Sequence, residues 1–129
     1  MRQLDLFGVQ ISQTFTKSCG NLEAVQVFIK SLPEAPQGNL KFSLFDGNQR
    51  LLASQEFPSS SLIAGDYLEL PVTLSSDTSE YEIRLESNVS SQASIVAALT
   101  TLNYYPGRFT MNGITGRGDL VIHYICTGP

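Results

Sequence analysis

The residues of this chain that could take part in catalysis are few and far apart. Hydrolysis or group transfer usually needs a base beside a nucleophile, and the only histidine is His123. A pairing of His123 with Cys19 or with a serine is open in three dimensions, but no Gly-x-Ser-x-Gly elbow surrounds either residue. A lone histidine more often fills a sheet face or forms a hydrogen bond at its rim. We therefore expect that the protein is not an enzyme.

The carboxylates and the possible metal ligands of the sequence do not indicate a catalytic site or a metal site either. Glu82 and Glu86 would share one face of a strand, yet they alternate with Ile83 and Leu85, which is typical of the solvated side of a sheet. His123 and two distant cysteines do not make a usual transition-metal ligand set. We expect no metal and no cofactor.

Polar and aromatic residues gather around two predicted turns. An aromatic ring beside fork-shaped donors is what recognition of the CH face and the hydroxyls of a sugar requires. The alternative is that the tyrosines pack at the rim of the fold with their hydroxyls in water. The candidate ligand-binding residues are Tyr104, Tyr105, Arg108 and Asn112 around Pro106-Gly107, and Asp46, Asn48 and Arg50 around Gly47.

Two aromatic residues indicate an exposed sheet face. Alternation along their segments places Phe28 and Phe45 on the sides that carry Gln26, Lys41 and Ser43. Exposed aromatic side chains on a sheet suggest either a ligand platform or a contact with another domain or subunit. Cover by a long loop is the alternative.

Length and charge narrow the class of protein. The chain has 129 residues and a formal net charge of -4, so we expect one domain over residues 1–129. The basic residues are spread thinly, so we expect no nucleic-acid partner. No apolar run approaches the ~20 residues that span a bilayer, and residues 1–9 lack the apolar core of a secretory signal. We expect a soluble chain without membrane insertion, and its compartment stays open.

Hydrophobic residues recur with period 2 along most of the chain. Leu40, Phe42 and Leu44, for example, alternate with Lys41 and Ser43, which predicts a half-buried strand. The same pattern covers residues 9–15, 25–29, 68–72, 81–85 and 120–124. Apolar residues on both sides of the last segment predict a central or covered strand. The cadence of strands and turns predicts an all-β, antiparallel, two-sheet jelly-roll sandwich.

Glycine and proline mark the breaks between these strands. Asp46-Gly47-Asn48 between two apolar runs is the strongest hairpin pattern, and residues 33–38, 58–65 and 75–79 are further turns. Only residues 91–101 could be helical, and we prefer a strand there because Ile95, Ala97 and Leu99 alternate.

Cys19 and Cys126 allow a single pairing within the chain. A bridge is geometrically reasonable because the first and last strands of a sandwich often lie side by side. Two free thiols, as in a cytosolic protein, are the simpler expectation.

The order of several short segments resembles the galactose-binding-domain-like jelly-roll sandwiches. Members of this group occur as accessory modules in bacterial surface-glycan and glycosyltransferase-associated proteins. The resemblance runs from Gly8 to Tyr124, and its motifs are short and consist mostly of residues that we expect to have a structural role. It rests on Ile11-Ser12-Gln13-Thr14-Phe15, Asn21-Leu22, Gly38-Asn39-Leu40-Lys41-Phe42-Ser43-Leu44, Tyr81-Glu82-Ile83-Arg84-Leu85, Tyr104-Tyr105-Pro106-Gly107, Met111-Asn112-Gly113 and Gly118-Asp119-Leu120-Val121-Ile122.

The resemblance implies a non-catalytic module that binds carbohydrate through loops at one end of the sandwich. The chain departs from it in having no tryptophan to stack on sugar rings. Relatives of this kind also hold a structural calcium in the loop after the first long strand, but here residues 16–23 offer only Asn21 and Glu23. We expect a carbohydrate-binding or accessory module of a larger glycan-related protein. The alternative is a structural domain whose Phe28 and Phe45 face contacts a neighbouring domain or a second copy.

Overall fold

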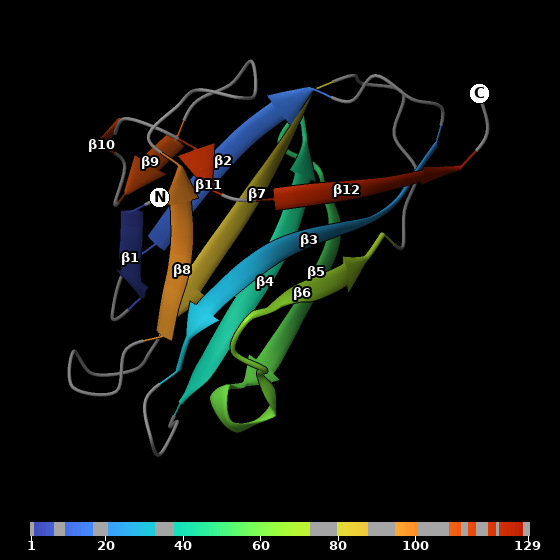
Figure 1. The fold of residues 1–129 in the computed structure, drawn as a ribbon. Helices are drawn as coiled ribbons and strands as arrows, with labels where there is room; N and C mark the ends of the chain where they lie inside the picture. The colour runs from blue at the N-terminus through green and yellow to red at the C-terminus, as the bar shows by residue number, and fades with distance from the viewer. Residues whose placement is uncertain are drawn as a thin grey trace.

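Two antiparallel sheets pack face to face in the part of the chain that the structure describes (Figure 1). Every strand pair among the described residues is antiparallel. The predicted all-β, antiparallel, two-sheet sandwich is therefore confirmed. The structure is a computed structural model, and it describes residues 2–6, 10–16, 21–32, 38–72, 80–87, 95–100, 109–111, 114–115, 119–120 and 122–127.

The first sheet is arranged around its longest strand, β3. The strand β6 pairs with one edge of β3, while β12 and then β8 pair with the other edge, so β6 and β12 flank β3. β8 also pairs with β1 and β11. The strands of this sheet are β1 (Arg2–Leu6), β3 (Asn21–Ser31), β6 (Asp66–Pro71), β8 (Ile95–Thr100), β11 (Asp119–Leu120) and β12 (Ile122–Thr127).

The second sheet follows the order β10-β9-β2-β7-β4-β5. β4 and β5 form a hairpin, and a short 3-10 turn at Ser59–Ser61 leads from β5 to β6 in the first sheet. The strands of this sheet are β2 (Gln10–Thr16), β4 (Asn39–Asp46), β5 (Leu51–Pro58), β7 (Glu80–Ser87), β9 (Phe109–Met111) and β10 (Ile114–Thr115).

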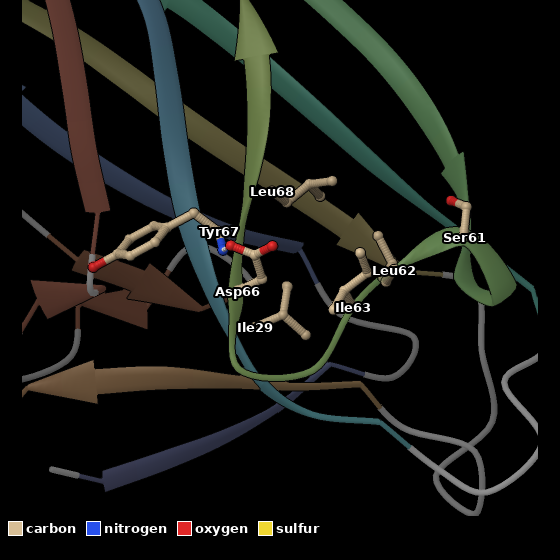
Figure 2. Close-up of a pocket in the computed structure, with 7 residues that line it drawn as sticks. All are labelled: Ile29, Ser61, Leu62, Ile63, Asp66, Tyr67 and Leu68. Carbon is tan, nitrogen blue, oxygen red and sulfur yellow. Dashed lines mark hydrogen bonds between the residues drawn. The ribbon is translucent and has the colours of Figure 1, made fainter.

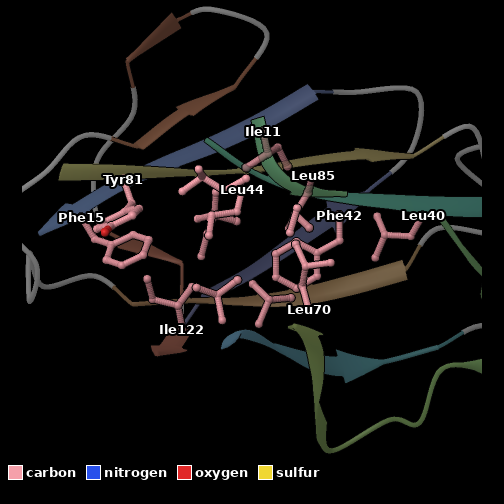
Figure 3. Packing of buried hydrophobic residues seen from close by; sticks show 14 of the residues in the cluster. Ile11, Phe15, Leu40, Phe42, Leu44, Leu70, Tyr81, Leu85 and Ile122 are labelled. Atoms are coloured by element: carbon pink, nitrogen blue, oxygen red, sulfur yellow. The ribbon is translucent and has the colours of Figure 1, made fainter. Parts of the chain in front are cut away.

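The alternating pattern of the sequence correctly predicts which side chains enter the core. On β4 the side chains of Leu40, Phe42 and Leu44 are fully buried, whereas Lys41 between them is exposed. β3 and β7 show the same alternation, with their apolar residues buried. Figure 3 shows Tyr81 and Leu85 of β7 in the core beside Phe42 and Leu44 of β4. Each buried large apolar side chain contributes about 1.5–3 kcal/mol to folding, so the register of each strand is strongly determined.

Aromatic residues join the two sheets at one end of the core. Phe15 on β2 stacks on Tyr81 of the neighbouring β7, with ring centroids 5.6 Å apart. It also stacks on Tyr124, which reaches it from β12 of the first sheet, at 5.5 Å. Gln13 points into the same core, and its Nε2 donates a hydrogen bond to the Thr14 carbonyl oxygen at 2.9 Å. The polar amide is thus partnered inside the sandwich.

Of two further predictions for single segments, the structure confirms one and contradicts the other. Residues 95–100 form β8, so the preference for a strand over a helix is confirmed. The prediction of a central or covered last strand is wrong. Among the described residues β12 pairs only with β3, and the side chains of His123 and Ile125 are exposed. Both side chains lie on the outer face of the first sheet. The prediction of a covered strand was wrong because it relied on the apolar residues on both sides of this segment.

The expectation of free thiols is also wrong. Cys126 on β12 is disulfide-bonded, and the chain has one other cysteine, Cys19, which lies outside the described residues. The bridge at Cys126 ties down a strand that, among the described residues, pairs with β3 alone. Among the described residues no helix is long and apolar enough to cross a bilayer.

Candidate functional site

The outer face of the first sheet presents aromatic and polar side chains together. Because the buried residues of β3 alternate with outward ones, Gln26 and Phe28 point away from the core. The strand register brings Tyr67 and Glu69 of β6 to one side of them and His123 of β12 to the other. We call this group the platform; it consists of Gln26, Phe28, Tyr67, Glu69 and His123.

Three rings of the platform contact one another in series. The ring of Phe28 meets Tyr67 edge-on, with centroids 5.2 Å apart and planes at 63°. Tyr67 stacks on the imidazole of His123 at 4.3 Å and 18°, and its hydroxyl lies 3.2 Å from His123 Nε2. Because β6 and β12 flank β3, the Tyr67 side chain must cross over β3 to make this contact. The result is a strip of rings that spans three strands.

A polar row runs beside the ring strip. His123 is the cross-strand neighbour of Gln26, and Gln26 is the cross-strand neighbour of Glu69. The Nε2 atom of Gln26 donates a hydrogen bond to Glu69 Oε1 at 2.8 Å. This bond orients the amide and leaves its carbonyl oxygen for another donor.

An apolar row borders the polar row on its far side. Ala24 of β3 pairs with Ile125 of β12 and with Pro71 of β6. The Ile125 side chain is 37% exposed. The platform and this row together give the first sheet an outer face of alternating aromatic, polar and apolar rows.

A small pocket lies at the start of β6. Its volume is about 190 Å³, and Leu62, Ile63 and Leu68 line it together with the polar residues Ser61 and Asp66. Figure 2 shows the Tyr67 ring pointing away from these residues. Since cavities for drug-sized ligands measure about 300–1,000 Å³, this pocket has room for a small group only.

The outer face of the second sheet is a charged, solvated surface. Phe45 lies under the guanidinium group of Arg84, whose Cζ is 4.2 Å from the ring centroid. Arg84 also forms an ion pair with Glu82 at 2.6 Å. The Phe45 ring is thus covered by a charged side chain, and this face offers no free aromatic surface within the described part of the chain.

Phe28 and Phe45 therefore do not form one surface. Phe28 belongs to β3 in the first sheet, and Phe45 belongs to β4 in the second sheet. Alternation correctly placed both rings on outward sides, but the sequence could not show that the two strands lie in different layers. Of the pair, Phe28 belongs to the platform.

Among the hairpin residues, Asp46 has a structural role. Asp46 is 3% exposed, and its Oδ1 accepts hydrogen bonds from the backbone N–H groups of Asn48 at 2.9 Å and Arg50 at 3.0 Å. The predicted hairpin is confirmed, with the left-handed conformation at Gln49 (φ 65°). Asn48 and Arg50 are exposed, but the Asp46 carboxylate is committed to its own turn.

The other predicted ligand-binding residues, Tyr104, Tyr105, Arg108 and Asn112, lie outside the described residues. The residues that sequence reasoning missed are Tyr67, Glu69, His123 and Gln26. Only the pairing of β3 with both β6 and β12 brings them together.

No metal site emerges from the described residues, and Cys19, the thiol considered as a partner of His123, lies outside them. No group of three or more histidine, cysteine, aspartate or glutamate residues is close enough there to hold a metal ion. His123 is engaged with the Tyr67 hydroxyl, and Cys126 is oxidised. The platform is suited to non-covalent binding, since it combines ring faces with hydrogen-bonding groups.

No protein-family model and no curated protein matches the chain.

Proposed function

We propose that the protein is a non-catalytic carbohydrate-binding module that binds its glycan on the platform. The observation that carries the proposal is the strip of Phe28, Tyr67 and His123 beside the Gln26–Glu69 pair. A sugar ring has an apolar CH face and a rim of hydroxyl groups, so it needs both kinds of partner. On this face Tyr67 or Phe28 would stack on the sugar, and Gln26 and Glu69 would bind its hydroxyls.

The outer face of the second sheet is less suited to bind a sugar than the platform is. Its Lys41 lies between Glu56 and Glu86 in the strand register, and its Phe45 is covered by Arg84. A sugar would have to displace a guanidinium group to reach the ring there. In the described part of the first sheet, the Tyr67 ring stacks on the imidazole of His123, and no guanidinium group lies over Phe28 or Tyr67.

The architecture of the fold also agrees with the family resemblance. An antiparallel two-sheet sandwich is compatible with a galactose-binding-domain-like jelly roll, and such modules serve as accessory domains of bacterial glycan-related proteins. We propose the same accessory role here, with the platform as the binding surface. The loop residues Tyr104, Tyr105, Arg108 and Asn112 remain candidates for additional contacts.

The experiment is a glycan-array screen of the purified domain with and without calcium, followed by isothermal titration of a bound glycan. An open sheet face predicts weak binding, with a Kd on the order of 0.1 mM. Tyr67→Ala should weaken binding about tenfold because it removes the central ring. Phe45→Ala is the matched control, since it removes a ring from the other sheet and should leave the affinity within twofold.

Either of two results would overturn the proposal. One is the absence of any bound glycan for protein that is folded by circular dichroism. The other is equal affinity of Tyr67→Ala and the unmodified protein. If Tyr105→Ala and Arg108→Ala abolish binding while Tyr67→Ala does not, the loops hold the site instead.

A second candidate function is assembly through the same outer face. The observation that favours it is the apolar row, in which Ile125 is 37% exposed beside Ala24 and Pro71. A homodimer or a docked domain would cover this row. Sedimentation at several concentrations tests it, because a dimer that Ile125→Ser abolishes supports assembly, whereas a monomer at all concentrations excludes self-association.

A further inference from the structure

The Gln26–Glu69 pair places an exposed carboxylate, which only accepts hydrogen bonds, on the platform. Gln26 uses one amide hydrogen on Glu69 Oε1. Its Oε1 and the second carboxylate oxygen of Glu69 can accept hydrogen bonds from a ligand, and its second amide hydrogen can donate one. Glu69 is exposed, and no further hydrogen-bond partner of its carboxylate is found among the described residues. A ligand group that contacts Glu69 therefore has to donate a hydrogen bond.

The formal charge of the platform is negative. Glu69 is its one carboxylate, and none of its members is a lysine or an arginine. Lys30 is the nearest cation along β3, four residues from Gln26, or roughly 13 Å at ~3.3 Å per residue. That separation exceeds the Debye length of about 8 Å at physiological ionic strength, so Lys30 neutralises little of this charge.

We infer that the platform selects neutral or amino-sugar glycans and rejects glycans that carry uronate or sulfate groups; this inference rests on the proposed function. A pair of adjacent sugar hydroxyls can donate to the two acceptors, and an ammonium group can form a charge-assisted hydrogen bond with Glu69. A carboxylate or sulfate in the same place would bring like charges within about 4 Å of each other and would lose these hydrogen bonds.

The test uses sets of glycans that share a backbone and differ in charge. The first set consists of the β-1,4-linked hexamers of glucose, glucosamine and glucuronate, and parallel sets carry the same changes on the galactose and mannose backbones. For whichever backbone binds, the uronate form should bind at least about tenfold more weakly than the neutral form in 150 mM salt. The glucosamine-type form should bind as tightly as the neutral form or more tightly.

Two isosteric variants distinguish the effect of the charge at Glu69 on glycan affinity from the effect of the net charge of the protein. Glu69→Gln keeps the shape of the side chain and its contact with Gln26, so it should narrow the gap between neutral and uronate forms to within about threefold. Glu56→Gln removes the same charge from the exposed edge strand β5 of the other sheet, and it should leave the gap unchanged.

The outcomes distinguish this inference from the proposed function. No binding of any set overturns both. Binding that Tyr67→Ala weakens, but that is equally tight for the uronate and neutral forms, overturns the charge selection alone. The same holds if Glu69→Gln and Glu56→Gln change the ratio equally, because selection would then follow net charge rather than the platform.

Discussion

The hydroxyl of Tyr67 lies 3.2 Å from Nε2 of His123, although 56 residues separate the two along the chain. The contact joins β6 to β12 across the outer face of β3. It holds the Tyr67 ring over the central strand, where it stacks on His123 at 4.3 Å and meets Phe28 at 5.2 Å. The two residues therefore determine the shape of the surface that we propose for glycan binding.

Removing this hydrogen bond alone should change affinity only slightly. Tyr67→Phe keeps the ring and its contacts with Phe28 and His123 but loses the hydroxyl. An exposed hydrogen bond contributes about 0.5–1.5 kcal/mol, so the free energy of unfolding should fall by less than about 1 kcal/mol. Glycan affinity measured by titration calorimetry should stay within about threefold. A loss as large as that of Tyr67→Ala would mean that the hydroxyl, and not the ring, makes the decisive contact.

Asp46 should contribute to stability and not to binding. Asp46→Ala removes two hydrogen bonds to the backbone N–H groups of Asn48 and Arg50. Urea denaturation should show a loss of about 1–3 kcal/mol, because both bonds have a charged acceptor. Asn48→Ala is the control in the same exposed turn and should cost less than about 0.5 kcal/mol. Unchanged stability of Asp46→Ala would contradict the structural role.

The hairpin also contains a position where glycine should stabilise the fold. Gln49 has a φ of 65°, which costs a non-glycine residue about 1 kcal/mol. Gln49→Gly should raise the free energy of unfolding by about 0.5 kcal/mol, since the greater freedom of the unfolded chain offsets part of the gain. The exposed 3.4 Å contact of its side chain with Arg84 contributes little. A destabilised variant would show that this contact outweighs the backbone strain.

The oxidised state of Cys126 predicts that the purified protein has no reactive thiol. A thiol assay on unfolded, unreduced protein should detect none, and mass spectrometry should find Cys19 linked to Cys126, the one pairing the chain allows. Closing a loop of roughly 100 residues stabilises a protein by up to about 4.7 kcal/mol in the chain-entropy view, so reduction should lower the melting temperature. Two reactive thiols in protein kept under oxidising conditions would contradict this.

Local information was enough to predict most strands. The alternation of Leu40, Phe42 and Leu44 with polar residues has the period of a pleated strand, and burying these side chains outweighs any competing register. The turn at Asp46-Gly47-Asn48 was predictable for the same reason, since an aspartate that accepts from its own loop needs no distant partner.

The last strand shows where local information was insufficient. His123 and Ile125 alternate with buried residues, and their types alone suggested a covered strand. Whether the outer side of a strand is covered depends on the layer above it, which is determined by other segments. In the described part of the chain β12 pairs only with β3, and the side chains of His123 and Ile125 are exposed.

The sequence by itself determined the fold class and the outward direction of Phe28 and Phe45, because strand periodicity is a property of neighbouring residues. Only the tertiary structure decided that Phe28 and Phe45 lie in different sheets, and that Tyr67 and His123 meet Phe28 on one face. These relationships depend on hydrogen-bonded ladders between strands that are distant in the chain. The pairing of such strands is selected by the packing of the whole core, which no single segment contains.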